Sequence, residues 1–284
     1  ILKFVQIKSQ SHDCSFTEYY QNILPELYEY NSNPTLIPSK TNFYEWRNIT
    51  NRLILLLSST HYVLRYDEIW DALCKVDRDV RNETLVRLIY SNTTLPCNPH
   101  GGSDNWNREH IWPKSFGIGT SQSKSNIDYA DIHNLTPAKA GVNSARGNKP
   151  YDFCYNSTAV SPSPYECQQP AVNTDSSQTP YDTGSNIGGL PRWMPPEAVR
   201  GNLARSHFYM ALRYNGSDTD GMIDDSNNQQ NTDQMVLSEC ACRKHSTAGN
   251  LTSLLSWHNN DNVDNLERRR NNESCYLYQH NRNP

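Results

Sequence analysis

Two segments place acidic, imidazole and carboxamide side chains close together in the sequence, and they constrain the fold of this chain more than any other feature. The first is NREHIWPKS, from Asn107 to Ser115, and the second is DIHNLTPAKAGVNSARGN, from Asp131 to Asn148. Glu109 and His110 are adjacent, so in an extended strand their side chains point to opposite faces. The first segment therefore predicts a strand with a carboxylate on one face and an imidazole on the other.

The second segment adds further polar groups beside a predicted helix start. Thr136 suits the N-cap of a helix and Pro137 its first position. Asp131, His133 and Asn134 come directly before them. We expect a carboxylate, an imidazole and a carboxamide from the two segments to converge on one point. An oxygen-rich set of this kind favours Mg²⁺ or Ca²⁺ over zinc, which prefers Cys and His.

Each residue alone also has a structural interpretation, as a solvated strand end or a hydrogen-bonded histidine, but the segments combine into a pattern. REHIWPKS, DIHNLTPA and VNSARGN resemble the active-site core of the endonuclease I family, bacterial periplasmic and secreted nonspecific nucleases with a ββα-metal site. The resemblance continues in YDEIWDAL, LVRLIYSN, GNLARSHFYMALRY and the terminal WHNNDNVDNLERRRNN. Several matching blocks in order, from about Thr50 to Pro284, are more specific than any one motif.

The resemblance implies an α+β fold, with mixed helices and short strands around a ββα-metal nuclease core. We expect a single domain with disulfides over residues 42–284, preceded by an N-terminal extension over residues 1–41. The implied function is metal-dependent, largely sequence-nonspecific endonuclease cleavage of DNA, with RNA as an expected second substrate and 5′-phosphate ends. The alternatives are a ribonuclease with little DNA activity and a noncatalytic nucleic-acid-binding glycoprotein on a nuclease scaffold.

The chemistry of phosphodiester hydrolysis suggests a role for each site residue. His110 is the expected general base, because imidazole titrates nearest neutral pH. Glu109 and Asn134 are the expected metal ligands, with Mg²⁺ as the ion and Ca²⁺ or Mn²⁺ as alternatives. His133 and Asp131 are expected to orient these ligands from a second layer of contacts.

The group that braces the phosphate is less clear, because the chain departs from the family at one point. Family members carry an arginine between the two segments, whereas Ile111 to His133 contains none. A lysine in that position supplies a point charge without the bidentate fork of arginine. The candidate phosphate contacts are Lys114, Lys124, Arg108, Arg146 and, from a downstream helix, Arg205.

Composition favours a secreted enzyme over a tight nucleic-acid-binding module. The chain has 284 residues, 36% hydrophobic residues and a formal net charge of −4, and polyanion binding draws on Lys and Arg. No run approaches the ~20 apolar residues of a membrane span. Ile1 is not a start methionine, so we expect a mature chain whose leader is missing from the sequence. No obligate protein partner is indicated.

The cysteines and glycosylation sequons also favour a secreted protein in an oxidising compartment. Eight dispersed cysteines without a CxxC pair indicate disulfides, although eight cysteines permit 105 pairings. A zinc site at Cys240, Cys242 and His245 is disfavoured by its CxC spacing. Glycosylation sequons begin at Asn48, Asn82, Asn92, Asn156, Asn215, Asn250 and Asn272. About five would arise by chance in a chain this rich in Asn, Ser and Thr, so they only support a secreted glycoprotein.

The coarse element pattern places these features on a framework. Apolar spacing predicts a helix from Asn42 to about Ser59. A strand from Thr84 to Tyr90 and burial of Trp106 and Trp112 are also expected. The remaining predicted helices cover Asp67 to Cys74, Pro195 to about Tyr214, and Leu251 to Asn271.

Overall fold

The structure is a computed structural model of the chain. It describes residues 53, 54, 57, 58, 61–91, 93–116, 118, 127–153, 166–168, 191–214, 248–281 and 283. The predicted extension over residues 1–41, Lys124 and the disfavoured zinc ligands lie outside these residues, so they remain predictions. No helix in the described part of the chain is long and apolar enough to cross a membrane.

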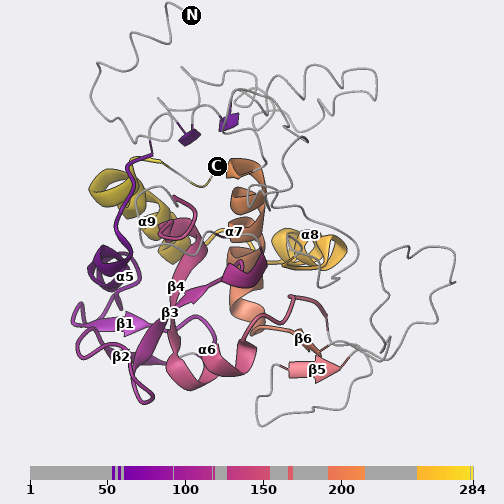
Figure 1. The fold of residues 1–284 in the computed structure, drawn as a ribbon, viewed down its shortest axis with the longest axis horizontal. Helices are drawn as coiled ribbons and strands as arrows, with labels where there is room; N and C mark the ends of the chain where they lie inside the picture. The colour runs from indigo at the N-terminus through magenta and orange to yellow at the C-terminus, as the bar shows by residue number, and fades with distance from the viewer. Residues whose placement is uncertain are drawn as a thin grey trace, which may run out of the picture.

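The described residues form a single α+β domain with a long helix at its centre (Figure 1). This helix, α7 (Arg200–Arg213), lies between α9 (Asn265–Glu273) and α8 (Leu251–Asn260), and α8 packs along it. The shorter helix α5 (Ile69–Val76) packs against α9. The helices predicted from 67 and from 195 are therefore confirmed, each entered through a short 3-10 turn.

The strands pair as short antiparallel ladders. Strand β1 (Leu85–Arg87) pairs with β2 (Thr94–Pro96), and β5 (Glu166–Gln168) pairs with β6 (Pro191–Trp193). The ladder that matters most for function joins β3 (Trp106–His110) to β4 (Leu135–Lys139), and α6 (Ala140–Arg146) follows β4 directly. β3, β4 and α6 together form a ββα unit next to α7 (Figure 1).

The main correction concerns the predicted helix start at Thr136 and Pro137. Both residues belong to strand β4, where Thr136 is opposite Glu109 and Pro137 is opposite Arg108. The helix begins at Ala140 instead. The capping signal is local, and pairing with β3 outweighs it because this pairing of the two segments buries β4.

Two further boundaries differ from the sequence prediction. The strand expected from Thr84 to Tyr90 is shorter, since β1 covers only Leu85–Arg87. The closing helix expected from Leu251 to Asn271 is two helices, α8 and α9. Asp264 caps the second helix by accepting a hydrogen bond from the Glu267 amide at 2.7 Å, and such a cap starts a new helix.

The core is rich in aromatic residues, and the ββα unit is anchored in it. Trp106 and Trp112, which flank the Glu109–His110 pair, are fully buried as predicted. A disulfide joins Cys74 on α5 to Cys97 after β2, which confirms that the chain uses cysteines as cross-links. Cys275 is also disulfide-bonded. Trp106 begins β3 and Trp112 follows it by two residues, so the strand with the two candidate catalytic residues is anchored in the core near both of its ends.

Candidate active site on strand β3

The Glu109 side of β3 is a buried polar network. Oε1 of Glu109 accepts hydrogen bonds from the Tyr90 hydroxyl at 2.8 Å and from Nη1 of Arg146 at 3.1 Å. The Tyr90 hydroxyl also contacts the hydroxyl of Tyr151. Burial raises the pKa of the Glu109 carboxyl, while the Arg146 guanidinium and the Tyr90 hydroxyl act in the opposite direction. Oε2 accepts no hydrogen bond from the residues that the structure describes.

Arg146 is part of the framework of this network. It comes from the last turn of α6 and is 1% exposed. Besides Glu109, it donates to the carbonyl oxygens of His110 at 2.9 Å and Ile111 at 2.8 Å. Its guanidinium therefore fixes both the carboxylate and the backbone at the end of β3, and it is not free to brace a phosphate.

His110 lies on the other side of the strand, among aromatic rings. Its Nε2 is 3.0 Å from the carbonyl oxygen of Tyr129. Because a carbonyl can only accept, Nε2 must carry the proton and Nδ1 the lone pair. The rings of Tyr66 and Tyr129 lie 5.7 and 5.2 Å from the imidazole. Burial lowers the pKa of His110 to about 3, so the imidazole is neutral at neutral pH.

Asn134 occupies a buried position with both ends of its carboxamide engaged. Its Oδ1 accepts from the Trp112 amide at 2.7 Å, and its Nδ2 donates to the Trp112 carbonyl at 3.3 Å. The Asn134 carbonyl accepts from the Ile111 amide at 2.9 Å. Asn134 therefore ties Ile111 and Trp112, which follow β3, to the 3-10 turn that precedes β4.

Asp131 and His133 form the next layer. Oδ1 of Asp131 accepts from the His133 amide at 2.9 Å, and Oδ2 accepts from the hydroxyls of Tyr209 and Tyr214, each at 2.7 Å. Nε2 of His133 lies 3.4 Å from the Asn281 carbonyl. The two predicted supporting residues therefore tie the turn before β4 to α7 and to the end of the chain.

The matching family model, described as Endonuclease I, covers residues 46–284. The chain belongs to the endonuclease I family. The extracellular ribonuclease of Bacillus subtilis (strain 168) is 38% identical over 228 residues, which cover 80% of this chain and 66% of the relative. The extracellular ribonuclease of Bacillus amyloliquefaciens is 36% identical over 230 residues, with the same two shares. The chain thus spans about two thirds of the length of these two relatives.

Within this endonuclease I domain, the predicted phosphate contacts are not brought together. Arg205 on α7 forms a bidentate pair with Glu267 on α9, with both N–O distances 2.6 Å. The guanidinium of Arg108 stacks over the rings of Tyr66 and Trp70, at 3.5 and 4.0 Å from their centroids. Neither side chain is presented to His110 as a free cation.

Lys114 is the basic residue best placed beside His110. It is exposed, and its Nζ lies 5.6 Å from the centroid of the Tyr129 ring, which also contacts His110. Its charge lowers the pKa of His110. Among the described residues it makes no hydrogen bond or ion pair, so its ammonium group is available to an anion.

Sequence reasoning missed a second carboxamide, Asn143 on α6. Its Nδ2 lies 3.4 Å from the carbonyl of Arg108, the residue just before Glu109. Asn143 and Arg146 are three residues apart on the helix, so both face the Arg108–His110 end of β3. Oδ1 of Asn143 accepts no hydrogen bond from described residues. Asn143 is part of the VNSARGN motif in the sequence. Its position relative to β3 became clear only once the helix was known to begin at Ala140.

Tyr90, Tyr151, Tyr66 and Tyr129 were also missed as parts of the site. Tyr151 follows Tyr90 by 61 residues, and the Glu109 network exists only because the fold joins these distant positions. No group of three or more His, Cys, Asp or Glu side chains in the described residues is arranged to hold a metal. One carboxylate with a carboxamide nevertheless fits Mg²⁺, which usually keeps several waters and binds one or two protein carboxylates.

Proposed function

We propose that this chain is a metal-dependent endonuclease that hydrolyses the phosphodiester bonds of RNA and DNA. The observation that carries the proposal is the division of strand β3. Glu109 on one side has a carboxylate whose Oε1 is held by Tyr90 and Arg146 while Oε2 has no hydrogen-bond donor among the described residues, and His110 on the other has an imidazole with a fixed tautomer. Membership of the endonuclease I family supports the reaction class.

His110 acts as the general base in this proposal. With its Nε2 proton donated to the Tyr129 carbonyl, Nδ1 removes the proton of the attacking water. The imidazolium that forms keeps its hydrogen bond to the Tyr129 carbonyl and lies beside the Tyr66 and Tyr129 rings, and these contacts offset part of the cost of burying its charge. Burial keeps the resting imidazole neutral, so a proton acceptor is present throughout the neutral range.

Glu109 and Asn143 would hold the divalent cation, with Mg²⁺ as the ion and Mn²⁺ or Ca²⁺ as substitutes. The cation supplies a Lewis acid that neutralises charge on the scissile phosphate. Asn143 suits this role better than Asn134, the ligand expected from the sequence, because the Asn134 oxygen already accepts the Trp112 amide. Asn134 instead positions the backbone that carries His110. Arg146 and Tyr90 orient the carboxylate of Glu109 from behind.

Lys114 would replace the arginine that other family members place between the two segments. It lies beside the rings that enclose His110 and is exposed. As an ammonium it contributes a point charge to the phosphate, without a bidentate contact. Products with 5′-phosphates follow if the 3′ oxygen is the leaving group.

The names of the relatives favour RNA as a substrate and an extracellular location. Both are called extracellular ribonucleases, so we propose that this chain is also secreted. The same names favour a second candidate, a ribonuclease that leaves duplex DNA intact. Only cleavage data separate the two.

Supercoiled plasmid and RNA, each incubated with purified protein in Mg²⁺ or EDTA, test the proposal. We expect both substrates to be cleaved in Mg²⁺ but not in EDTA. The products should carry 5′-phosphate ends. RNA cleavage with intact plasmid supports the ribonuclease candidate. If neither substrate is cut with any divalent ion, the proposed activity is wrong.

A further inference from the structure

A continuous stack of flat side chains leads away from the His110 face of the site. The His110 ring stacks on Tyr66, with centroids 5.7 Å apart. The guanidinium carbon of Arg108 lies 3.5 Å from the centroid of the Tyr66 ring and 4.0 Å from that of Trp70. Trp70 also stacks on His100, with centroids 4.1 Å apart and planes 7° apart. We refer to Tyr66, Arg108, Trp70 and His100 as the stacking ladder.

The stacking ladder lies at the surface, and His100 forms its outer end. All four of its side chains are partly exposed, whereas Trp106, which meets the Trp70 and His100 rings nearly at right angles, is fully buried. Trp70 covers one face of the His100 ring, and no described residue stacks on the other face or hydrogen-bonds to the imidazole. Gly101 follows with φ of 71°, and a side chain there would meet no described atom within 4 Å. The described residues therefore leave room for a flat ring beside His100.

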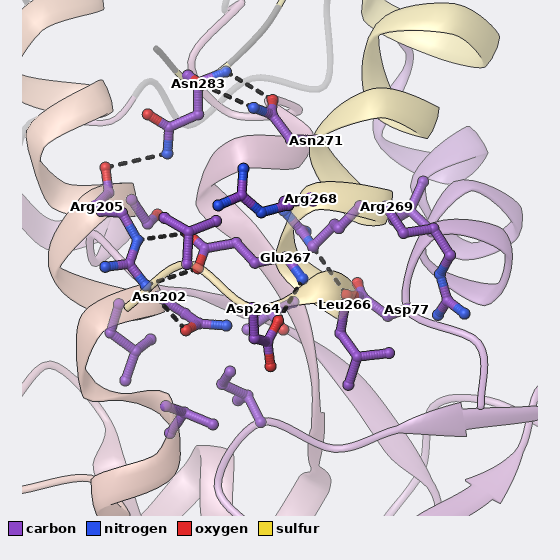
Figure 2. Close-up of a pocket in the computed structure, with 18 of the residues that line it drawn as sticks. Asp77, Asn202, Arg205, Asp264, Leu266, Glu267, Arg268, Arg269, Asn271 and Asn283 are labelled. Atoms are coloured by element: carbon purple, nitrogen blue, oxygen red, sulfur yellow. Dashed lines mark hydrogen bonds and ion pairs between the residues drawn. The ribbon is translucent and has the colours of Figure 1, made fainter. Parts of the chain in front are cut away.

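Arg108 gives the stacking ladder a positive charge that no described carboxylate neutralises at ion-pair distance. It donates through Nη1 to the carbonyl oxygen of Tyr66, and the rings of Tyr66 and Trp70 hold its guanidinium. Arg205, by contrast, is neutralised by Glu267 through two contacts of 2.6 Å between α7 and α9 (Figure 2). The stacking ladder thus combines aromatic faces with a cation that is held in place by rings.

Aromatic faces with an arginine between them suit the bases of a single-stranded nucleic acid. Unpaired bases stack on aromatic side chains and on guanidinium planes. Such stacking accepts any base, since every base has a π face, and nearby cations attract the phosphate backbone. A base inside a duplex already stacks on its neighbours, so its faces are not available to a histidine ring. The stacking ladder therefore favours a single strand over a duplex.

We propose that His100 stacks one base of a single-stranded substrate, while the adjoining backbone of the same strand reaches His110. This subsite rests on the proposed function, because it binds the strand that is cut at β3. Trp70 supports the His100 ring from behind and is in turn held against Arg108. The preferred substrate is then RNA or DNA that has unpaired bases next to the cleaved bond.

Fluorescence anisotropy of labelled strands, with the full chain carrying His110→Ala in EDTA, tests the subsite without cleavage. The probes are decathymidylate and an abasic strand of the same length and charge. Decathymidylate should bind at least ~5-fold more tightly, as expected for the stacking of one base. Adding His100→Ala should remove this difference and leave the affinity for the abasic strand unchanged.

Two matched variants control for the loss of the histidine. His100→Phe keeps a flat face without the imidazole nitrogens, so it should retain the preference for decathymidylate. His258 on α8 is an exposed histidine outside the stacking ladder, where it meets the Phe208 ring nearly at right angles. His258→Ala should therefore change neither affinity.

Three results would overturn the subsite. The first is equal binding of decathymidylate and the abasic strand when His100 is present. The second is an equal loss of both strands in His100→Ala. The third is a loss in His100→Phe as large as that in His100→Ala, because it would assign the effect to the imidazole nitrogens and not to stacking.

Cleavage by the chain with His110 intact separates the subsite from the proposed function. His100→Ala should raise the KM for single-stranded RNA by ~5-fold, and by more than the KM for supercoiled plasmid, whose bases are stacked in a duplex. If the wild type cuts neither substrate but the binding pattern holds, the subsite stands and the proposed activity fails. If it cuts RNA but binds both probes equally, the activity stands and the subsite fails.

Discussion

The two faces of strand β3 are built from different groups, although their central residues are adjacent in sequence. On the Glu109 face, a guanidinium and two tyrosine hydroxyls form a buried polar network. On the His110 face, two aromatic rings and one carbonyl surround a neutral imidazole. The strand therefore separates an environment that can hold a cation from one that keeps a base uncharged. Adjacent residues gain different chemistry because the pleat directs them into different surroundings.

Removing the charged partner on the Glu109 face should have the largest effect on stability. Arg146→Met leaves the Glu109 carboxylate buried without its cation and removes donors from two carbonyls. Breaking a buried ion pair in this way typically costs ~3–5 kcal/mol. Urea unfolding measures the loss. The double variant Glu109→Gln/Arg146→Met is the control and should recover part of it. A loss below ~1 kcal/mol would show that Arg146 does not support this face.

The two carboxamides should differ in their effect on metal binding. Asn143→Ala is expected to weaken Mn²⁺ binding, measured by electron paramagnetic resonance, by at least the ~10- to 100-fold seen when a group supporting a metal site is removed. Asn134→Ala should lower the melting temperature but leave the Mn²⁺ affinity of the folded protein nearly unchanged, because its carboxamide binds the Trp112 backbone. The reverse result would restore Asn134 as the ligand.

His207 on α7 sharpens the comparison, because it is a buried imidazole that packs against the Tyr151 ring, with centroids 5.0 Å apart, but makes no hydrogen bond to Glu109 or His110. Its Nδ1 donates to the Leu203 carbonyl at 2.8 Å, and burial lowers its pKa to about 3. The unfolded chain, with a histidine pKa of 6.5, therefore binds more protons between these two values. The free energy of unfolding must then fall as pH decreases through this range, by up to ~1.4 kcal/mol per pH unit for one group.

The corresponding experiment compares wild type with His207→Gln by urea unfolding at pH 7.5 and pH 5. The variant should lose less stability on acidification, by about 2 kcal/mol, since it lacks this titration. Its cleavage rate at pH 7.5 should stay close to that of wild type, in contrast to any His110 variant. Parallel pH profiles for the two proteins would mean that His207 is not kept neutral by the fold.

The smallest expected effect comes from the hydroxyl that orients Glu109. Tyr90→Phe removes one hydrogen bond to the carboxylate, a change of ~0.5–1.5 kcal/mol, or about 2- to 10-fold in equilibrium terms. We expect the Mg²⁺ concentration for half-maximal cleavage to rise by this factor, with little change in rate at saturating Mg²⁺. A lower saturated rate with an unchanged Mg²⁺ requirement would contradict the assignment of Tyr90 to the cation-holding Glu109 face.

Much of the site was predictable from sequence because local rules fix it. The alternation of a strand separates Glu109 from His110 wherever that segment is extended. The start of α6 was not predictable from Thr136 and Pro137, because the pairing of β4 with β3 is a contact between distant segments that overrides a capping signal. The role of Arg146 was hidden for a similar reason. Sequence shows its charge, but only the fold shows that its partners are Glu109 and two carbonyls.

The most direct test of the account measures Mn²⁺ binding and cleavage together in His110→Ala and Glu109→Gln. His110→Ala should bind Mn²⁺ with the affinity of wild type but cut RNA at least ~100-fold more slowly, as expected for loss of a general base. Glu109→Gln should lose Mn²⁺ binding and cleavage together. Equal loss of Mn²⁺ affinity in both variants, or unimpaired cleavage by His110→Ala, would contradict the division of base and metal between the two faces of β3.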